Sequence, residues 1–250
     1  STGKLGAMII ESFMDSNYGE IDYEAENPRG NMLKAPRNPM FEVFHIHSST
    51  ATKPEGKCVE WEPNFQWPMG YSCNDILYHS IVKNSAQEVY DAMKEHVPRV
   101  DVVIHSMAVS DFTFNRENPV KLKSNDPEGF CDYLKANIKM NPKIIKMVKE
   151  WNPEVYLIGF KFEVGLSYQE LIDVAQAARK SYHGDFVLAN DKQLMTEAKR
   201  HCAWLCSDYE IIEAYDKKDI ANKIFLAVKR RLLAKEFDKA VKNGMNEIHD

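Results

Sequence analysis

Residues 101–112, DVVIHSMAVSDF, decide the fold of this chain, because an apolar run stops there at small and acidic residues. Residues 101–107 are rich in β-branched and apolar side chains and too few for a helix, so they are predicted to form a buried strand of a parallel sheet. Ligands of open parallel sheets bind beyond the carboxyl ends of the strands. Ser110 and Asp111 therefore stand where a ligand is expected.

Strand and helix patterns alternate on both sides of this stretch. A further strand is predicted at 76–82, and further buried strands are predicted at 155–160 and 185–191. Two capping boxes predict helix starts, namely Ser85 with Glu88 and Ser167 with Glu170. A third helix is predicted to begin at Asn141-Pro142, with Asn141 as N-cap and the proline in the first helical position, and to run to about Trp151. The repeated β-α-β order indicates an α/β fold with a mostly parallel sheet flanked by helices.

The two ends of the chain add helices and a hairpin. CAWLC at 202–206 and YEIIEAY at 209–215 predict a closing hairpin, and 219–241 predicts a long helix with apolar residues at spacings of four. The chain opens on a helix with Leu5, Ile9 and Phe13 on one face, so the strand that normally precedes such a helix is expected upstream of Ser1.

Two segments fit the alternation poorly. Residues 15–75 are rich in turn signals and yield only one predicted strand, FEVFHIH at 41–47. Residues 113–138 are polar and too many for a crossover loop, which predicts a flap. We treat 1–250 as a single domain that contains both segments.

Composition limits the classes of protein to consider. The chain has 250 residues, of which 44% are apolar, enough to bury the core of one α/β domain or two small ones. A net charge of -5 has the wrong sign for a general nucleic-acid binder and favours a small-molecule partner. Apolar runs fall short of the roughly 18 residues that span a bilayer, and the start STGKLG is unlike a signal peptide. Five cysteines without a CxxC pair suit reduced thiols in the cytoplasm.

Three predicted strands end at polar or charged residues, namely at Ser110-Asp111, Phe160-Lys161 and Asn190-Asp191. The flap adds Lys121 and Lys123, and the helix at Asn141 adds free backbone N–H groups. Together these groups offer a carboxylate for a ribose or a metal, cations for phosphates and an aromatic face for a base. The set predicts a nucleotide pocket.

Each of these residues also has a plain structural explanation. Asp111 can cap a turn, Phe160 can belong to the core, and the two flap lysines can be solvated. His45 and His47 share one side of a strand but lack a third ligand at a recognisable spacing, which favours a surface strand over a metal site. Cys202 and Cys206 are expected to be packing residues. Gly3-Lys4 is followed by Leu5, which excludes a P-loop, and the GxGxxG fingerprint of dehydrogenases is absent.

The order of several segments resembles one enzyme family. STGKLG opening a helix, IHSMAVSDF, KLK, NPKIIKMVKEWNPEVYLIGFKFEV and RKSYHGDFVLAND follow one another as in phosphopantothenate-cysteine ligase (phosphopantothenoylcysteine synthetase) of coenzyme A biosynthesis, most closely its stand-alone bacterial form. The resemblance covers most of residues 1–14 and 76–215. It implies a Rossmann-like homodimer in the cytoplasm that joins 4'-phosphopantothenate to L-cysteine, with CTP or ATP as co-substrate and Mg²⁺.

The resemblance also implies roles for single residues. Asp111 would contact the nucleotide, Lys121 would bind its triphosphate as the catalytic cation, and Phe160 would sit against the base. The backbone of four residues would lie along the base: Pro142, Lys143, Ile144 and Ile145. Lys180 would bind a further phosphate, although a second lysine of the family falls near Gln176 here.

The acid substrate would contact another set of residues. Its phosphate would be held by the loop that contains Ser1, Gly3 and Gly6, and Met107 and Ala108 would contact it across the dimer. Family members begin with a strand and a glycine-rich turn, and an asparagine precedes their Ser-x-Gly loop; these features would lie upstream of Ser1. The alternatives that stay open are a nucleotide- or flavin-binding module without ligase activity and a Rossmann oxidoreductase.

Overall fold

The larger of two main sheets holds three of the four strands of the predicted alternation. In this computed structural model, which describes residues 4–15, 41–55, 58–60, 76–114 and 125–246, its strand order is β10-β9-β8-β7-β4. The strands are β4 (Val102–His105), β7 (Tyr156–Glu163), β8 (Phe186–Asp191), β9 (Ala203–Cys206) and β10 (Ile211–Ala214). β4, β7 and β8 are parallel, and β9 and β10 form the antiparallel hairpin that the sequence predicts.

A second sheet of parallel strands has the order β1-β3-β2. It consists of β1 (Glu42–His47), β2 (Cys58–Glu60) and β3 (Ile76–Val82). The strands predicted at 41–47 and 76–82 are therefore confirmed, while most of the unassigned segment 15–75 lies outside the described residues.

Helices α2 (Ala86–His96), α4 (Ile144–Trp151) and α5 (Tyr168–Ser181) cover one side of the larger sheet. Both predicted capping boxes form, at Ser85 and at Ser167, because each serine accepts a backbone N–H while a glutamate three residues on accepts the serine N–H. The α2 helix gives way at Val97 to a 3₁₀ turn, Val97–Arg99, as the proline at 98 requires. One apolar cluster joins α2 to β4 and α4, including Val89, Val103 and Val148.

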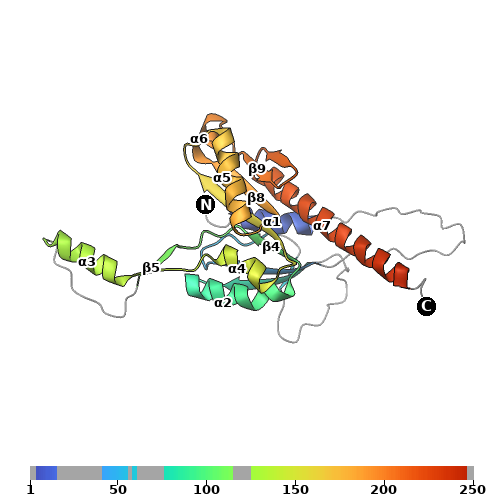
Figure 1. The fold of residues 1–250 in the computed structure, drawn as a ribbon, viewed down its shortest axis with the longest axis horizontal. Coiled ribbons are helices and arrows are strands. Elements are labelled where there is room, and N and C mark those ends of the chain that lie inside the picture. Colours follow the sequence, from blue (N-terminus) through green and yellow to red (C-terminus); the bar gives the residue numbers. More distant parts are fainter. Residues whose placement is uncertain (1–3, 16–40, 56–57, 61–75, 115–124, 247–250) are drawn as a thin grey trace, which may run out of the picture.

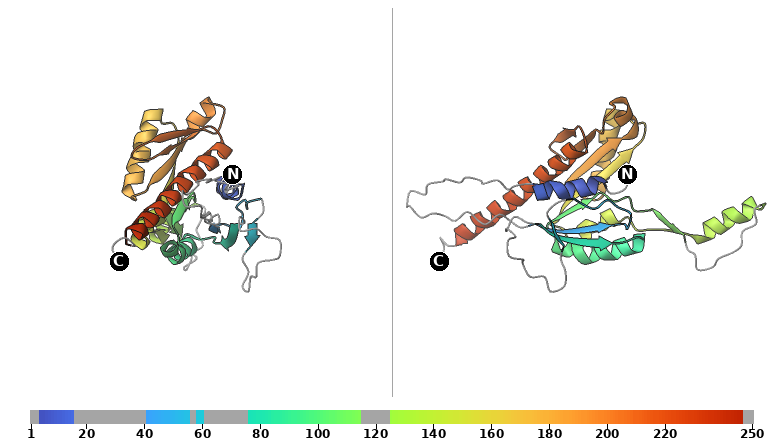
Figure 2. Two further views of the ribbon diagram at one scale, coloured as in Figure 1. Left: turned by 90° about the vertical axis from the view of Figure 1, so that its right-hand side faces the viewer. Right: turned by 180° about the vertical axis from the view of Figure 1, so that it is seen from behind.

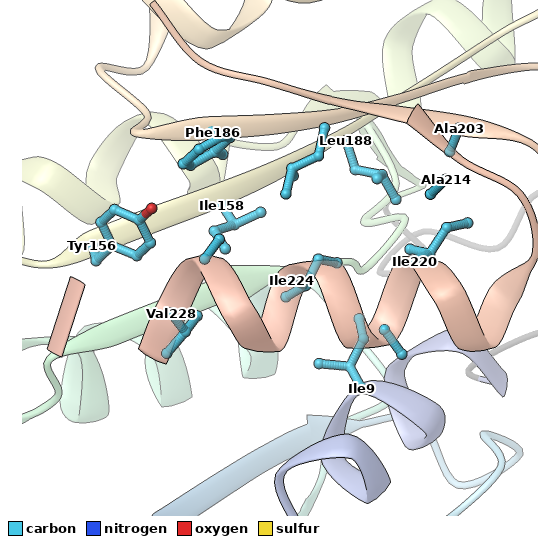
Figure 3. Packing of buried hydrophobic residues seen from close by; sticks show 13 residues of the cluster. Ile9, Tyr156, Ile158, Phe186, Leu188, Ala203, Ala214, Ile220, Ile224 and Val228 are labelled. Atoms are coloured by element: carbon cyan, nitrogen blue, oxygen red, sulfur yellow. The ribbon is translucent and has the colours of Figure 1, made fainter. Parts of the chain in front are cut away.

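Helices α1 (Lys4–Asp15) and α7 (Lys217–Asn246) pack side by side on the opposite face (Figure 1). Figure 3 shows Ile9 of α1 and the α7 side chains at spacings of four, Ile220, Ile224 and Val228, against the sheet residues Ile158 and Leu188. All are buried, so the apolar stripe of α7 packs against this face of the sheet.

The described residues of the segment predicted as a flap form an extension that reaches away from the body (Figures 1 and 2). It pairs β5 (Phe112–Phe114) with β6 (Ile138–Met140) in antiparallel fashion and carries α3 (Pro127–Asn137). We call these three elements the arm. A further short helix, α6 (Lys192–Glu197), follows β8. Within the described ranges, every helix is too short or too polar to cross a bilayer.

Candidate functional site

Asn141 ties the segment after β4 to the segment before α4. Its backbone N–H donates to the carbonyl of Asp111 at 2.9 Å, and its side-chain amide donates to the carbonyl of Ser110, also at 2.9 Å. Its amide oxygen accepts the hydroxyl of Thr113 at 2.7 Å. Two segments about thirty residues apart are thereby held in one geometry. The structure confirms that Asp111 and the start of α4 are neighbours.

The α4 helix begins later than the sequence predicts. Its first residue is Ile144 and its N-cap is Lys143, which makes no side-chain capping bond. The prediction of Asn141 as N-cap and Pro142 as first helical residue is wrong, because the Asn141 side chain is engaged with Ser110 and Thr113. The first N–H groups of α4 therefore lack a side-chain cap, which suits the binding of an anion.

An ion pair stands at this helix start. Nζ of Lys143 lies 2.6 Å from Oδ1 of Asp111, with 61% and 51% of the two side chains exposed. An exposed pair of this kind contributes about 0–1 kcal/mol to stability, so a ligand can replace it at small cost. Sequence reasoning gave Lys143 only a backbone role. A lysine at a helix N-terminus is unfavourable because its charge opposes the helix dipole. This unusual position is the sequence feature that could have identified Lys143 as a candidate site residue.

The opposite end of the site is the face of β7 that α4 covers. A side chain added at Gly159 would lie 2.9 Å from Cδ1 of Ile145 and 2.3 Å from the hydroxyl of Tyr182. Strand alternation puts Lys161 on this same face, where its Nζ lies 2.7 Å from Oε1 of Glu163. Lys161 is thus, besides Lys143, a second basic residue that is a candidate for the site.

Phe160 occupies the other face of β7. It packs, partly buried, against the cluster of α1 and α7, whereas Ile144 and Ile145 belong to the cluster of α2 and α4. The structure does not bring Phe160 together with the start of α4. The strand also does not end at Phe160-Lys161, as the sequence suggested, since β7 pairs with β8 through Glu163.

Two buried polar atoms lack a partner among the described residues, namely Nε2 of His105 and the hydroxyl of Tyr182. His105 ends β4 and is paired in register with Gly159, over which the Tyr182 ring lies. Burial lowers the pKa of His105 and raises that of Tyr182, so both are neutral near pH 7. Both side chains lie on the face of the sheet that α4 covers.

Asp191 has a structural role. Its carboxylate is fully buried and accepts the backbone N–H groups of Gln193, Leu194 and Leu166. Burial alone would raise its pKa, but these hydrogen bonds outweigh burial and lower it. Asp191 therefore caps α6 and fixes the loop before α5, and its carboxylate is already occupied.

Lys180 lies near the amino ends of the parallel strands, whereas the candidate site lies at their carboxyl ends. It stands in the last turn of α5, just before the amino end of β8, while Asp111 follows the carboxyl end of β4. Gln176, one turn earlier, donates to the carbonyl of Ser207 at 2.6 Å. The structure does not bring Lys180 together with Asp111 and Lys143, and its phosphate role stays a prediction.

The residues predicted to hold the acid substrate are only partly described. A side chain added at Gly6 of α1 would lie 3.5 Å from the hydroxyl of Ser106, which directly precedes Met107 and Ala108. These predicted contacts therefore lie next to one another at the end of β4. Ser1, Gly3 and the flap residues Lys121 and Lys123 lie outside the described residues.

Several histidines lie elsewhere in the described part of the chain, beside a pocket between β1, β3 and α2. A cavity of about 370 Å³ separates β1 and β3 from α2 and is lined by Phe44, His79 and His96 among others. His45 and His47 bond to Tyr78 and Ser80 of β3, at 2.7 and 2.9 Å. In the described part of the chain no group of three metal-ligating side chains occurs. Cys202 and Cys206 are buried free thiols, as predicted.

Residues 74–232 match the family model described as the DNA/pantothenate metabolism flavoprotein C-terminal domain. Two relatives named coenzyme A biosynthesis bifunctional protein CoaBC are similar in sequence. The one from Thermococcus kodakarensis is 29% identical over 164 residues, and the one from Methanocaldococcus jannaschii is 28% identical over 157. These matches cover 64% and 62% of this chain but only 39% and 37% of the relatives.

Solved structures show the same fold. The DNA/pantothenate metabolism flavoprotein from Streptococcus pneumoniae has a TM-score of 0.62 at 24% identity, over 92% of this chain and 89% of its own. A Cab2 mutant in complex with phosphopantothenate-cysteine has a TM-score of 0.58 at 13% identity, over 94% of this chain and 80% of its own. The mostly parallel sheet flanked by helices is thus common to all three.

Proposed function

Because the chain belongs to the family of the DNA/pantothenate metabolism flavoprotein C-terminal domain, we propose that it is a ligase of coenzyme A biosynthesis that joins 4'-phosphopantothenate to L-cysteine. CTP, or alternatively ATP, would supply the energy. The observation that carries the proposal is the Asn141 clamp, which holds Asp111 and Lys143 at the uncapped start of α4. The clamp lies within the matched residues.

The proposed reaction has two steps. A carboxylate oxygen of the acid attacks the α-phosphate of CTP, and pyrophosphate leaves with the electron pair of the broken P–O bond. The cysteine amine then attacks the acyl carbon of the acyl-cytidylate, loses a proton and expels CMP. Negative charge develops on phosphoryl oxygens in the first step, so fixed cations and N–H groups contribute most there. Lys143 and the start of α4 fit this task, and Lys121 is proposed as the further catalytic cation.

Mg²⁺ is proposed as the companion of the nucleotide. It is bound in such sites by one or two carboxylates plus phosphate oxygens, and it neutralises charge on the phosphates. Asp111 is a suitable single carboxylate, since its side chain is 51% exposed.

A homodimer is the proposed assembly, with the arm as its contact. Four large apolar side chains of the arm are exposed: Phe112 at 54%, Phe130 at 44%, Ile138 at 47% and Met140 at 72%. The α3 helix has no buried residue. Such a surface on an extension from the body is typical of a protein–protein contact. The described thiols Cys131, Cys202 and Cys206 are free, which favours a cytoplasmic location.

Pyrophosphate release tests the proposal. The chain is assayed with CTP and Mg²⁺, with and without 4'-phosphopantothenate, and release is expected only when the acid is present. Asp111→Asn should slow release at least tenfold, since the carboxylate faces the nucleotide. Asp101→Asn is the matched control, because Asp101 precedes the other end of β4 and also pairs with a lysine, Lys235. Equal rates in the two variants would remove Asp111 from the site.

A further inference from the structure

The α7 helix carries a second apolar stripe on the side turned away from the sheet. Its first stripe, which includes Ile220, Ile224 and Val228, is buried against the sheet. A residue two positions beyond Ile224 lies about 200° further around the helix. Large apolar side chains that gather on one exposed face mark an interaction site. We use the name outer stripe for three exposed side chains: Leu226 at 52%, Leu233 at 46% and Phe237 at 70%.

The outer stripe lies far from the arm. The α7 helix runs past the end of the sheet, and the arm extends from the opposite side of the body (Figures 1 and 2). Residues 236–239 are exposed. A short stretch of helix surrounded by water is only marginally stable, so a partner would stabilise this part of α7. A contact here would be separate from the proposed contact through the arm.

The spacing of the outer stripe favours a helix as its partner. Leu226, Leu233 and Phe237 follow one another at seven and four residues, which is the spacing of the seam of a coiled coil. Arg230 stands between them in the seam, where it lies 2.9 Å from Oε1 of Glu210. A cation in the middle of the apolar face disfavours a lipid surface as the partner.

The residues beside the seam favour a second α7 in antiparallel orientation. One border of the seam carries Lys229 and Glu236, and the other border carries Ala234. In an antiparallel pair of identical helices the like borders meet, whereas in a parallel pair the unlike borders meet. An antiparallel pair centred between Lys229 and Glu236 therefore brings each lysine to a glutamate of the other helix. A parallel pair would bring Lys229 to Ala234.

The same register fits the apolar side chains. With Lys229 opposite Glu236, Phe237 of one helix lies opposite Leu226 of the other. The two-fold symmetry of such a pair repeats both contacts. Exposed ion pairs contribute little to affinity, so the apolar side chains would supply the affinity and the charges would set the orientation.

We propose that two copies of the chain pair through the outer stripes of their α7 helices, antiparallel and in this register. The contact is short, so the association is weak and depends on concentration. Because the contact is distinct from the arm, it adds a second association step to the one that the arm provides. The proposal does not depend on the ligase function.

Charge reversal combined with sedimentation tests the orientation. Lys229→Glu and Glu236→Lys should each lower the weight-average mass about twofold at concentrations where the unmodified chain is associated, because like charges then meet. The double variant should regain the mass of the unmodified chain, because the ion pairs form again in reversed order. Asp238→Lys is the matched control, since Asp238 is exposed but lies outside the seam and its borders, and the mass should not change. The arm is intact in all four variants.

Leu233→Asp tests the apolar contact. This substitution should also lower the mass about twofold at the same concentrations, because a charge would be buried between the two helices. At low concentration its urea midpoint should equal that of the unmodified chain, since Leu233 is exposed in the single copy.

Four results would overturn the proposal. The first is equal mass for the unmodified chain and Leu233→Asp at every concentration, and the second is a double charge variant that stays dissociated. The third is a lower urea midpoint for Leu233→Asp at low concentration, because it would show that another part of the same chain covers the stripe. The fourth is binding of the unmodified chain, but not of Leu233→Asp, to vesicles of phosphatidylcholine and phosphatidylserine, because it would assign the stripe to a lipid surface.

Discussion

Gly159→Ala should destabilise the chain although its backbone is compatible with alanine. The added Cβ would lie 2.3 Å from the hydroxyl oxygen and 2.7 Å from Cζ of Tyr182, distances that require movement of the ring. The ring cannot easily move, since it is buried and a side chain at Gly184 would also clash with it, at 2.2 Å from Cε2. Overpacking costs about 1–3 kcal/mol, while Gly→Ala lowers unfolded-state entropy and stabilises by about 0.4–1 kcal/mol. The expected net loss is about 1–2 kcal/mol.

A double-mutant cycle measures this contact. Urea unfolding is followed for the unmodified chain, Gly159→Ala, Tyr182→Leu and the double variant. Leucine lacks the Cζ and hydroxyl atoms, so the contacts with the ring are lost while the contact at 2.9 Å with Cδ1 of Ile145 remains. Gly159→Ala should therefore be less destabilising in that background, by about 1 kcal/mol or more. A coupling energy within about 0.5 kcal/mol of zero would refute the packing argument.

Three further predictions concern chemistry and pH. Lys121→Ala should slow acyl-nucleotide formation roughly a hundredfold, because a cation on the transferring phosphates supplies a few kcal/mol; unchanged pyrophosphate release would refute it. CTP should give a higher kcat/KM than ATP, since backbone edges at the start of α4 can discriminate a pyrimidine by hydrogen bonding; equal or better values with ATP would contradict this. Burial, with the charges of His47 and Lys53, lowers the pKa of His45 to about 4, so the unfolded state binds more protons and stability should fall as pH drops from about 6.5 to about 4. His45→Phe should flatten that pH dependence of the urea midpoint, and an unchanged slope would count against it.

Local signals predicted most of the fold. The two capping boxes and the buried strands could be predicted because the residues that define each of them lie close together in the sequence. The start of α4 was not, because the Asn141 side chain is engaged by Ser110 and Thr113, which lie about thirty residues earlier. A local capping pattern does not show whether residues distant in the sequence compete for the capping side chain.

The candidate site was also predictable only in part, because some of its contacts depend on tertiary geometry. Asp111 and the segment before α4 were expected to meet at the carboxyl edge of the sheet, and they do. The Lys143–Asp111 pair depends on tertiary geometry and was missed. The orientation of Phe160 depends on how far β7 continues, and the sequence suggested too early an end. Tyr182 lies over two glycines from different segments, and no local pattern predicts such packing.

The central claim is that the acid is activated as an acyl-nucleotide at this site, and oxygen transfer tests it most directly. 4'-Phosphopantothenate labelled with ¹⁸O in its carboxylate is incubated with the chain, CTP and Mg²⁺, with L-cysteine or hydroxylamine as the acceptor amine. Attack of the carboxylate on the α-phosphate predicts one ¹⁸O in the released CMP by mass spectrometry. CMP without the label, or label in inorganic phosphate, would contradict the proposed chemistry.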